Sequence, residues 1–465
     1  MNENAPPPQI PQRGAARPQT ISRGRMMLLF AVMLTTAAGN TAMQSVMPSI
    51  GTALGVNDVW ISLAYTWSAL LWVICAPFWA RRSDQRGRKA MMTLGLMGFI
   101  VSMALCGLVM WFGLAGALPV VWTLVLFALF RSLYGWFGSA APPAVQAYVA
   151  SRTPRSERTQ ALSLIASSFG LGTVIGPALA PLMVFPGLGL VGPFVAFALL
   201  GVAALFALRL RLPNDEPQFA ARGRTYDAPW GASSTDEQAS EELVEDVVDE
   251  DEEDEPPAPV RSGSKQNMGW WEPRLRPWVI AGLLGGHAHA MILGLTGFLV
   301  LDRLGLRSDP AAGTGPVAIV LMCGAAATLL AQWGVIPRFK LGPRAATLAG
   351  VLLGGLGAVS MHFAQDLHAI SLTYAVASLG FGLFRPGYNA GASLAVTRSE
   401  QGEASGIVAS ITGAAFVFAP ALGVFLYNIS DWFAFLTVAL LCGIVFAMGW
   451  RNLTLDEIAT KDRAT

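Results

Sequence analysis

A few ionisable side chains that could bind or carry charge lie inside long apolar stretches of this sequence. Arg131 and Arg385 could bind an anion, and His287 and His289 could take up and release a proton near neutral pH. A charge in apolar surroundings is costly unless it faces water or a partner of opposite charge. No Asp or Glu lies inside any of the apolar segments. The pattern therefore predicts an electropositive cavity that selects a small molecule carrying negative charge.

Further polar and aromatic side chains occur at spacings that place them beside these charges. Asn40 and Gln44 are four residues apart, so they share one face of a helix. Asn389 follows Arg385 by the same spacing, and Tyr134 and Tyr388 could add aromatic surface. For Asn40 and Gln44, contact with a substrate and hydrogen bonding between helices remain equal alternatives.

The two histidines are the candidates for coupling transport to protons. His287 and His289 are two residues apart, so they point to nearly opposite sides of a helix and only one is expected to face a cavity. We favour His287, and the alternative is a neutral histidine that serves only packing.

The composition identifies the elements that must position these residues. The chain has 465 residues, of which 53% are hydrophobic and 13% are charged, against a usual charged share of about 25%. Apolar runs of about 20 residues recur, which is the length that crosses a bilayer as a helix. The sequence therefore predicts an all-α membrane protein with twelve transmembrane helices. The expected spans are 26–49, 60–80, 90–113, 118–148, 161–184, 189–209, 277–301, 314–335, 343–364, 368–395, 404–427 and 432–450.

The twelve spans fall into two groups of six, separated by a polar insert. We expect an N-terminal half at 26–209 and a C-terminal half at 276–451, with tails at 1–25 and 452–465. The insert at 210–275 contains the acidic run VDEDEEDEPP. Such a run repels itself and buries little apolar area, so the insert is expected to be a disordered linker.

Lys and Arg are distributed unevenly between the loops. They gather in the tails, in the insert and in the segments after spans 2, 4 and 8, whereas most loops on the other side lack them. The exception is 302–309, which carries Arg303 and Arg307. The positive-inside rule then predicts a multi-pass protein of the cell (inner) membrane with both termini and the linker in the cytoplasm.

The two halves are related by an internal repeat. Residues 143–179 match residues 386–422 at a constant shift of 243, including Pro143 with Pro386 and Pro177 with Pro420. Because both copies run in the same direction, the halves are predicted to be parallel repeats with a substrate site between them near the midplane.

Two short motifs accompany this organisation. The loop after span 2 reads Ala80-Arg-Arg-Ser-Asp84-Gln-Arg-Gly87-Arg88-Lys89. Span 5 contains Gly172-x-x-x-Gly176-Pro177-x-x-Ala180, whose small residues let two helices approach closely and whose proline bends the helix.

With the Arg131-Ser-Leu-Tyr134-Gly135-Trp-Phe-Gly138 segment of span 4, these motifs resemble those of the major facilitator superfamily. The resemblance is to the drug:proton antiporter type, near the tetracycline-efflux-like group. It implies that Asp84, Gly87, Arg88 and Lys89 form a cytoplasmic gate and that the motif of span 5 favours export. It also implies that spans 1, 4, 7 and 10 line the cavity.

The sequence favours a secondary transporter over an enzyme. It contains no phosphate-binding Gly-x-x-x-x-Gly-Lys-Ser/Thr motif, and no spacing of its four cysteines fits a metal site or cofactor. We expect proton-coupled efflux of a small organic molecule, anionic or drug-like. The alternative is an organic-anion uptake carrier or exchanger. The expected partners are the substrate, protons and the lipid bilayer, with no nucleic acid, and the protein is expected to be a monomer.

Overall fold

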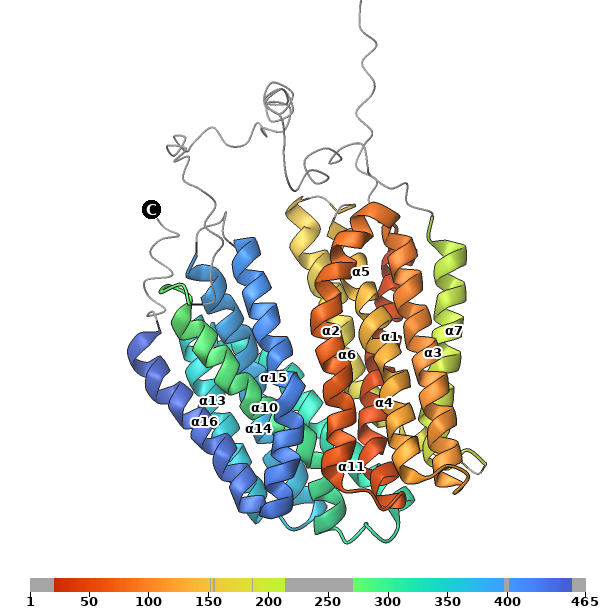
Figure 1. The fold of residues 1–465 in the computed structure, drawn as a ribbon. Coiled ribbons are helices and arrows are strands. Elements are labelled where there is room, and N and C mark those ends of the chain that lie inside the picture. Colours follow the sequence, from red (N-terminus) through yellow and green to blue (C-terminus); the bar gives the residue numbers. More distant parts are fainter. Residues whose placement is uncertain are drawn as a thin grey trace, which may run out of the picture.

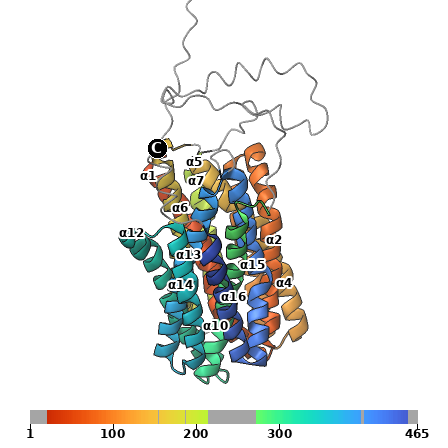
Figure 2. The ribbon, with the colours of Figure 1, turned by 90° about the vertical axis from the view of Figure 1, so that its left-hand side faces the viewer.

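A computed structural model describes residues 21–150, 152–153, 155–185, 187–213, 271–396 and 401–453. The tails at 1–20 and 454–465 and most of the predicted linker lie outside these residues. The long helices form two bundles whose members run along one common direction (Figures 1 and 2). The fold is all-helical in the described residues, as the sequence predicts.

The N-terminal bundle contains six long helical segments, and they occupy the sequence order that the apolar runs predict. Its helices are α1 (Arg23–Ala53), α2 (Asp58–Arg86), α3 (Arg88–Leu114), α4 (Val120–Phe137), α5 (Ala141–Ala150), α6 (Arg155–Leu179) and α7 (Gly192–Arg211).

The C-terminal bundle repeats this arrangement after the linker. Its helices are α10 (Arg276–Arg303), α11 (Pro310–Leu329), α12 (Ile336–Phe339), α13 (Pro343–Phe363), α14 (Leu367–Leu394), α15 (Gln401–Ile429) and α16 (Asp431–Asn452).

Two predicted spans are interrupted, contrary to the continuous helices expected. The span at 118–148 is divided into α4 and α5 by a 3₁₀ turn at Gly138–Ala140, because Pro142 and Pro143 lack the N–H groups that would continue the helix. The span at 314–335 begins earlier, at Pro310, and ends in a π-helical turn at Leu330–Val335. That widened turn precedes Pro337, whose ring cannot fit a regular α-helical turn. The short α12 after it projects from the side of the bundle (Figure 2).

Ten helical segments in the described residues are long and apolar enough to cross a membrane. The two remaining segments of the twelve are α6 and α15, and α15 contains the shorter apolar stretch Gly413–Ile429. Large apolar side chains such as Trp122, Phe206 and Leu372 are exposed on the outside of the bundles. An exposed apolar surface of this kind is what lipid chains cover.

The chain enters and leaves both bundles on one side. The first residue of α1, the last of α7, the first of α10 and the last of α16 lie at this side, which we call the linker face (Figure 1). The turns at 54–57 and 304–309 lie at the other side, the distal face.

Candidate functional site

The predicted cation Arg131 lies in the interior of the N-terminal bundle. Its side chain is buried, with 3% of the residue exposed. The Nη2 group donates a hydrogen bond to Oδ1 of Asn40 on α1. The guanidinium carbon lies 4.4 Å from the ring centre of Tyr134 and 5.9 Å from that of Tyr65 on α2. Three of the predicted residues, Asn40, Arg131 and Tyr134, therefore form one cluster, and Tyr65 is an addition that the sequence did not suggest.

The cluster leaves much of the binding capacity of Arg131 unused. Its Nε and Nη1 groups are buried, and among the described residues they have no hydrogen-bond partner and no carboxylate contacts the guanidinium. Burying the donors of a charged group without acceptors destabilises the protein, so the binding of an acceptor at such a site is favourable. Gln44, the other predicted residue of α1, is half-buried one turn from Asn40. The arrangement can accept an oxygen-bearing, negatively charged group at Arg131.

The motif of span 5 holds α6 against α1, beside this cluster. A Cβ atom added at Gly172 would lie 2.6 Å from the Cβ of Ala37, and one at Gly176 would collide with Thr41 and the backbone of Ala38. The Thr41 hydroxyl donates to the Gly172 carbonyl at 3.0 Å. Pro177 lies inside α6 directly after this contact. The glycines are therefore needed for the close approach of the two helices.

Replacing Gly176 by leucine is expected to destabilise the protein by about 1–3 kcal/mol, because the new side chain has no space between α6 and α1. The thermal unfolding midpoint of the purified protein measures this loss. Gly443→Leu is the matched control, since a Cβ at Gly443 of α16 meets no atom within 4 Å. Equal midpoints for the two variants would contradict the close packing.

The two histidines of α10 have different surroundings. His289 stacks on Phe381, with ring centres 4.8 Å apart, and its edge faces Phe416 at 6.1 Å. His287 is half-buried, and its Nδ1 lies 2.7 Å from the carbonyl oxygen of Leu283. If Nδ1 carries the proton and donates in this contact, Nε2 remains an acceptor. The two rings thus differ in their contacts: His289 packs on aromatic rings, whereas His287 contacts a backbone carbonyl oxygen.

The predicted residues of α14 lie in the C-terminal bundle, apart from the Arg131 cluster in the chain's other half. Arg385 is exposed, and it lies close enough to His289 for its positive charge to act on that side chain. Tyr388 is buried with its ring centre 4.9 Å from that of Phe384. Asn389 has a buried Oδ1 without a hydrogen-bond partner.

The predicted gate motif forms the turn between α2 and α3 at the linker face. Gly87 has φ +90°, a conformation that favours glycine, and α3 begins at Arg88. Lys89 donates to the carbonyl oxygen of Arg209 at 3.1 Å and to that of Leu212, at the end of α7. The side chain of Asp84 lies outside the described residues, so its gate role stays a prediction.

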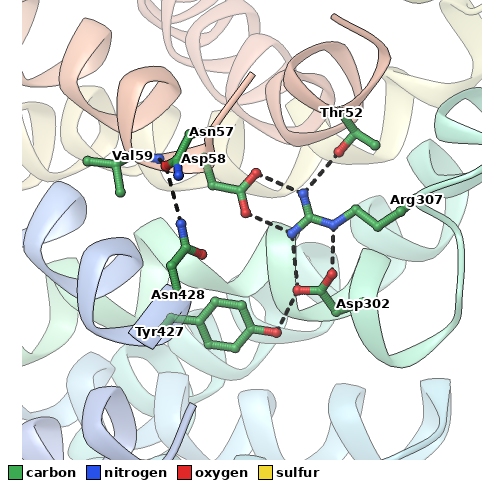
Figure 3. Close-up of polar contacts among 8 residues, drawn as sticks. All are labelled: Thr52, Asn57, Asp58, Val59, Asp302, Arg307, Tyr427 and Asn428. Atoms are coloured by element: carbon green, nitrogen blue, oxygen red, sulfur yellow. Dashed lines mark hydrogen bonds and ion pairs between the residues drawn. The ribbon is translucent and has the colours of Figure 1, made fainter. Parts of the chain in front are cut away.

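The distal face carries a charge network that joins the two halves (Figure 3). Arg307 of the C-terminal half donates to both carboxylate oxygens of Asp58, at 2.7 Å each, and to the Thr52 hydroxyl at 3.2 Å. The same guanidinium donates to Asp302 at 2.7 and 3.0 Å, and Tyr427 donates to Asp302 at 2.8 Å. We call these five residues the Arg307 network.

Local structure places the three charged members of this network. Asp58 is the first residue of α2, where the helix dipole favours a carboxylate, and it follows the N-cap Asn57. Asn57 also accepts a hydrogen bond of 3.3 Å from Asn428 of α15, a second contact between the halves. Asp302 belongs to the last turn of α10, and the tight turn at 304–309 returns Arg307 toward it.

The Arg307 network explains why 302–309 departs from the general lack of Lys and Arg in distal loops. Partial burial alone would lower the pKa of Arg307, but the hydrogen bonds and charges of Asp58 and Asp302 outweigh burial and raise it. Arg307 therefore stays positive at any pH used for a transport assay. Arg303 is likewise paired, with Asp431 at 2.5 Å. Both arginines of this segment are therefore bound to carboxylates at the distal face.

Comparison with known proteins agrees with this architecture. The sequence pattern of the Major Facilitator Superfamily matches residues 29–340 and 338–464. A multi-drug resistance efflux pump PmrA homolog of Lactococcus lactis is 31% identical over 36% of this chain and 38% of its own length. Multidrug resistance protein MdtG of Proteus mirabilis is 28% identical over 32% and 35%.

These alignments span only about a third of the length of the curated relatives. Among solved structures, a D-xylose-proton symporter superposes with a TM-score of 0.67 over 93% of this chain and 98% of its own, at 14% identity. At that identity the superposition bears on the fold alone. The family match covers both helical halves, and this chain belongs to the Major Facilitator Superfamily.

Proposed function

We propose that this superfamily transporter exports a small organic anion, or a drug-like molecule with an anionic group, in exchange for protons. Transport proceeds by alternating access, in which the two halves rock about a site near the midplane. The substrate enters from the linker face and leaves at the distal face.

The observation that carries the anionic substrate is the state of Arg131. It is a buried cation that has two unpartnered donor groups and no carboxylate in contact within the part of the chain that the structure describes. A carboxylate or similar group on a substrate would supply the missing acceptors, and charge-assisted hydrogen bonds of this kind are among the strongest. Arg385, exposed on α14, is a second cation that a rocking motion could bring toward the same substrate.

Two features support export. The motif of Gly172, Gly176 and Pro177 resembles the span-5 motif of antiporters, and its glycines pack α6 directly on α1, which carries Asn40 of the Arg131 cluster. Of the two relatives described above, one is named a multi-drug resistance efflux pump homolog and the other a multidrug resistance protein. With the linker face in the cytoplasm, as the distribution of Lys and Arg favours, passage toward the distal face is export.

The experiment uses purified protein in sealed vesicles without ATP, with an imposed pH gradient and a fluorescent carboxylate as the probe. Accumulation of the probe against its gradient, abolished by a protonophore, is the expected result. Transport that does not depend on the pH gradient but requires a second anion on the opposite side of the vesicle membrane would instead indicate an exchanger.

Proton coupling is assigned to His287. His287→Asn is expected to keep downhill movement of the probe but to lose its dependence on the pH gradient, because asparagine does not titrate. His289→Phe is the matched control on the same helix, since phenylalanine preserves the stacking on Phe381. Loss of coupling in the His289 variant and not in the His287 variant would reverse the assignment.

A further inference from the structure

A pocket of about 650 Å³ lies at the linker face, away from the Arg131 cluster and the Arg307 network. It is formed where the α2–α3 turn meets the end of α7. Arg86, Lys89 and Arg209 line one part of it, and among the residues that the structure describes no Asp or Glu lines it. The described lining therefore carries an excess of positive charge.

The rest of the lining continues along one face of α3. Ala90, Thr93, Leu94 and Met97 follow the spacing of a single helix face, and Met97 is 42% exposed. With a rise of 1.5 Å per residue, Met97 lies about 12 Å deeper along the helix than Lys89. The pocket thus passes from a cationic end at the helix terminus to an apolar end among lipid-facing side chains.

We propose that this pocket binds the phosphate headgroup and upper acyl chain of an anionic phospholipid of the linker-face leaflet. The exposed guanidinium groups of Arg86 and Arg209 contact the phosphate. Lys89 fixes the distance between α3 and α7 through its hydrogen bonds to the α7 carbonyls and adds its charge. Leu94 and Met97 contact the acyl chain. A free phosphate ion would use only the cationic end, so the apolar continuation selects a lipid. Basic pockets between helices at a membrane face bind anionic headgroups in this way.

The test is native mass spectrometry of the intact protein in detergent, with phosphatidylglycerol or phosphatidylcholine added at equal concentration and inorganic phosphate as the third probe. Preferential retention of phosphatidylglycerol is expected. Arg86→Gln combined with Arg209→Gln should weaken that binding by about fivefold for each arginine removed. Arg211→Gln is the matched control, because Arg211 is exposed at the same helix end but does not line the pocket.

Three outcomes would overturn the proposal. The first is equal retention of the two lipids, and the second is binding of inorganic phosphate as strong as that of the lipid. The third is a several-fold gain in lipid binding when the acidic residues at 249–255 are neutralised, which would make the acidic insert the occupant in the intact chain.

Discussion

Replacing Arg307 by alanine is expected to release the distal face and to shift the protein toward conformations open on that side. In the structure, the Asp58 side chain is only 8% exposed and depends on Arg307 for its paired charge. Removing one partner of a buried ion pair costs about 2–5 kcal/mol. The Arg307 side chain is 32% exposed, so water screens the pair and we expect a free-energy cost at the lower end of this range, about 2 kcal/mol. A difference of about 2 kcal/mol corresponds to roughly a 30-fold change in the equilibrium between the closed and open conformations.

The measurement is the distance between spin labels at Ala117, which is exposed in the loop between α3 and α4, and His368, which is exposed in the first turn of α14. We expect one short-distance population in the unmodified protein and a major long-distance population in Arg307→Ala. The exchange of charges in Asp58→Arg with Arg307→Asp should restore the short distance, because an arginine at 58 faces two carboxylates as Arg307 does. An unchanged distance in the single variant would show that apolar packing, such as that of Gly297 against Pro48, holds the face closed by itself.

The sequence could predict the fold because its main signals are local. Hydrophobic runs and helix breakers depend on residues close together in the chain, and the repeat at a shift of 243 was found by comparing two short segments residue by residue. The interruptions at Gly138–Ala140 and Leu330–Val335 were missed, although the neighbouring prolines were the signal that could have revealed them. A proline at the edge of an apolar run marks a possible break but does not say whether the chain kinks or changes its helical period.

The contacts between distant residues were only partly accessible. Arg131 could be recognised as an intramembrane charge, and its partner Asn40 as a polar residue of α1, but the sequence did not pair them or suggest Tyr65. The Arg307 network joins residues 249 positions apart, and each is an ordinary loop or helix-end residue by itself. The two arginines in 302–309 were the available signal, because they are the exception among distal loops that otherwise lack Lys and Arg.

Replacing Arg131 by glutamine is expected to abolish transport of an anionic substrate while leaving the protein as stable as before or more so. Glutamine can still donate to Asn40, and the variant no longer buries a charge without a carboxylate in contact. Neutralising an uncompensated buried charge is neutral or favourable for folding. The loss of two or more charge-assisted hydrogen bonds to the substrate should lower transport by about 100-fold or more. Transport of a fluorescent carboxylate in vesicles and the thermal midpoint measure the two effects.

The combination of these effects separates a binding residue from a structural one. If Arg131 serves only to hold α4 to α1 and α2, Arg131→Gln lowers the midpoint, and transport falls equally for the carboxylate and for its neutral amide. If Arg131 binds the anionic group, the thermal unfolding midpoint of Arg131→Gln stays unchanged. Transport of the carboxylate is then lost, whereas transport of the amide is not. Arg131→Lys is the matched variant, because it keeps the charge but not the planar fork of donors, so intermediate transport of the carboxylate is expected. In that case the buried positive charge of Arg131 lowers the stability of the fold and is present because it binds the anionic group of the substrate.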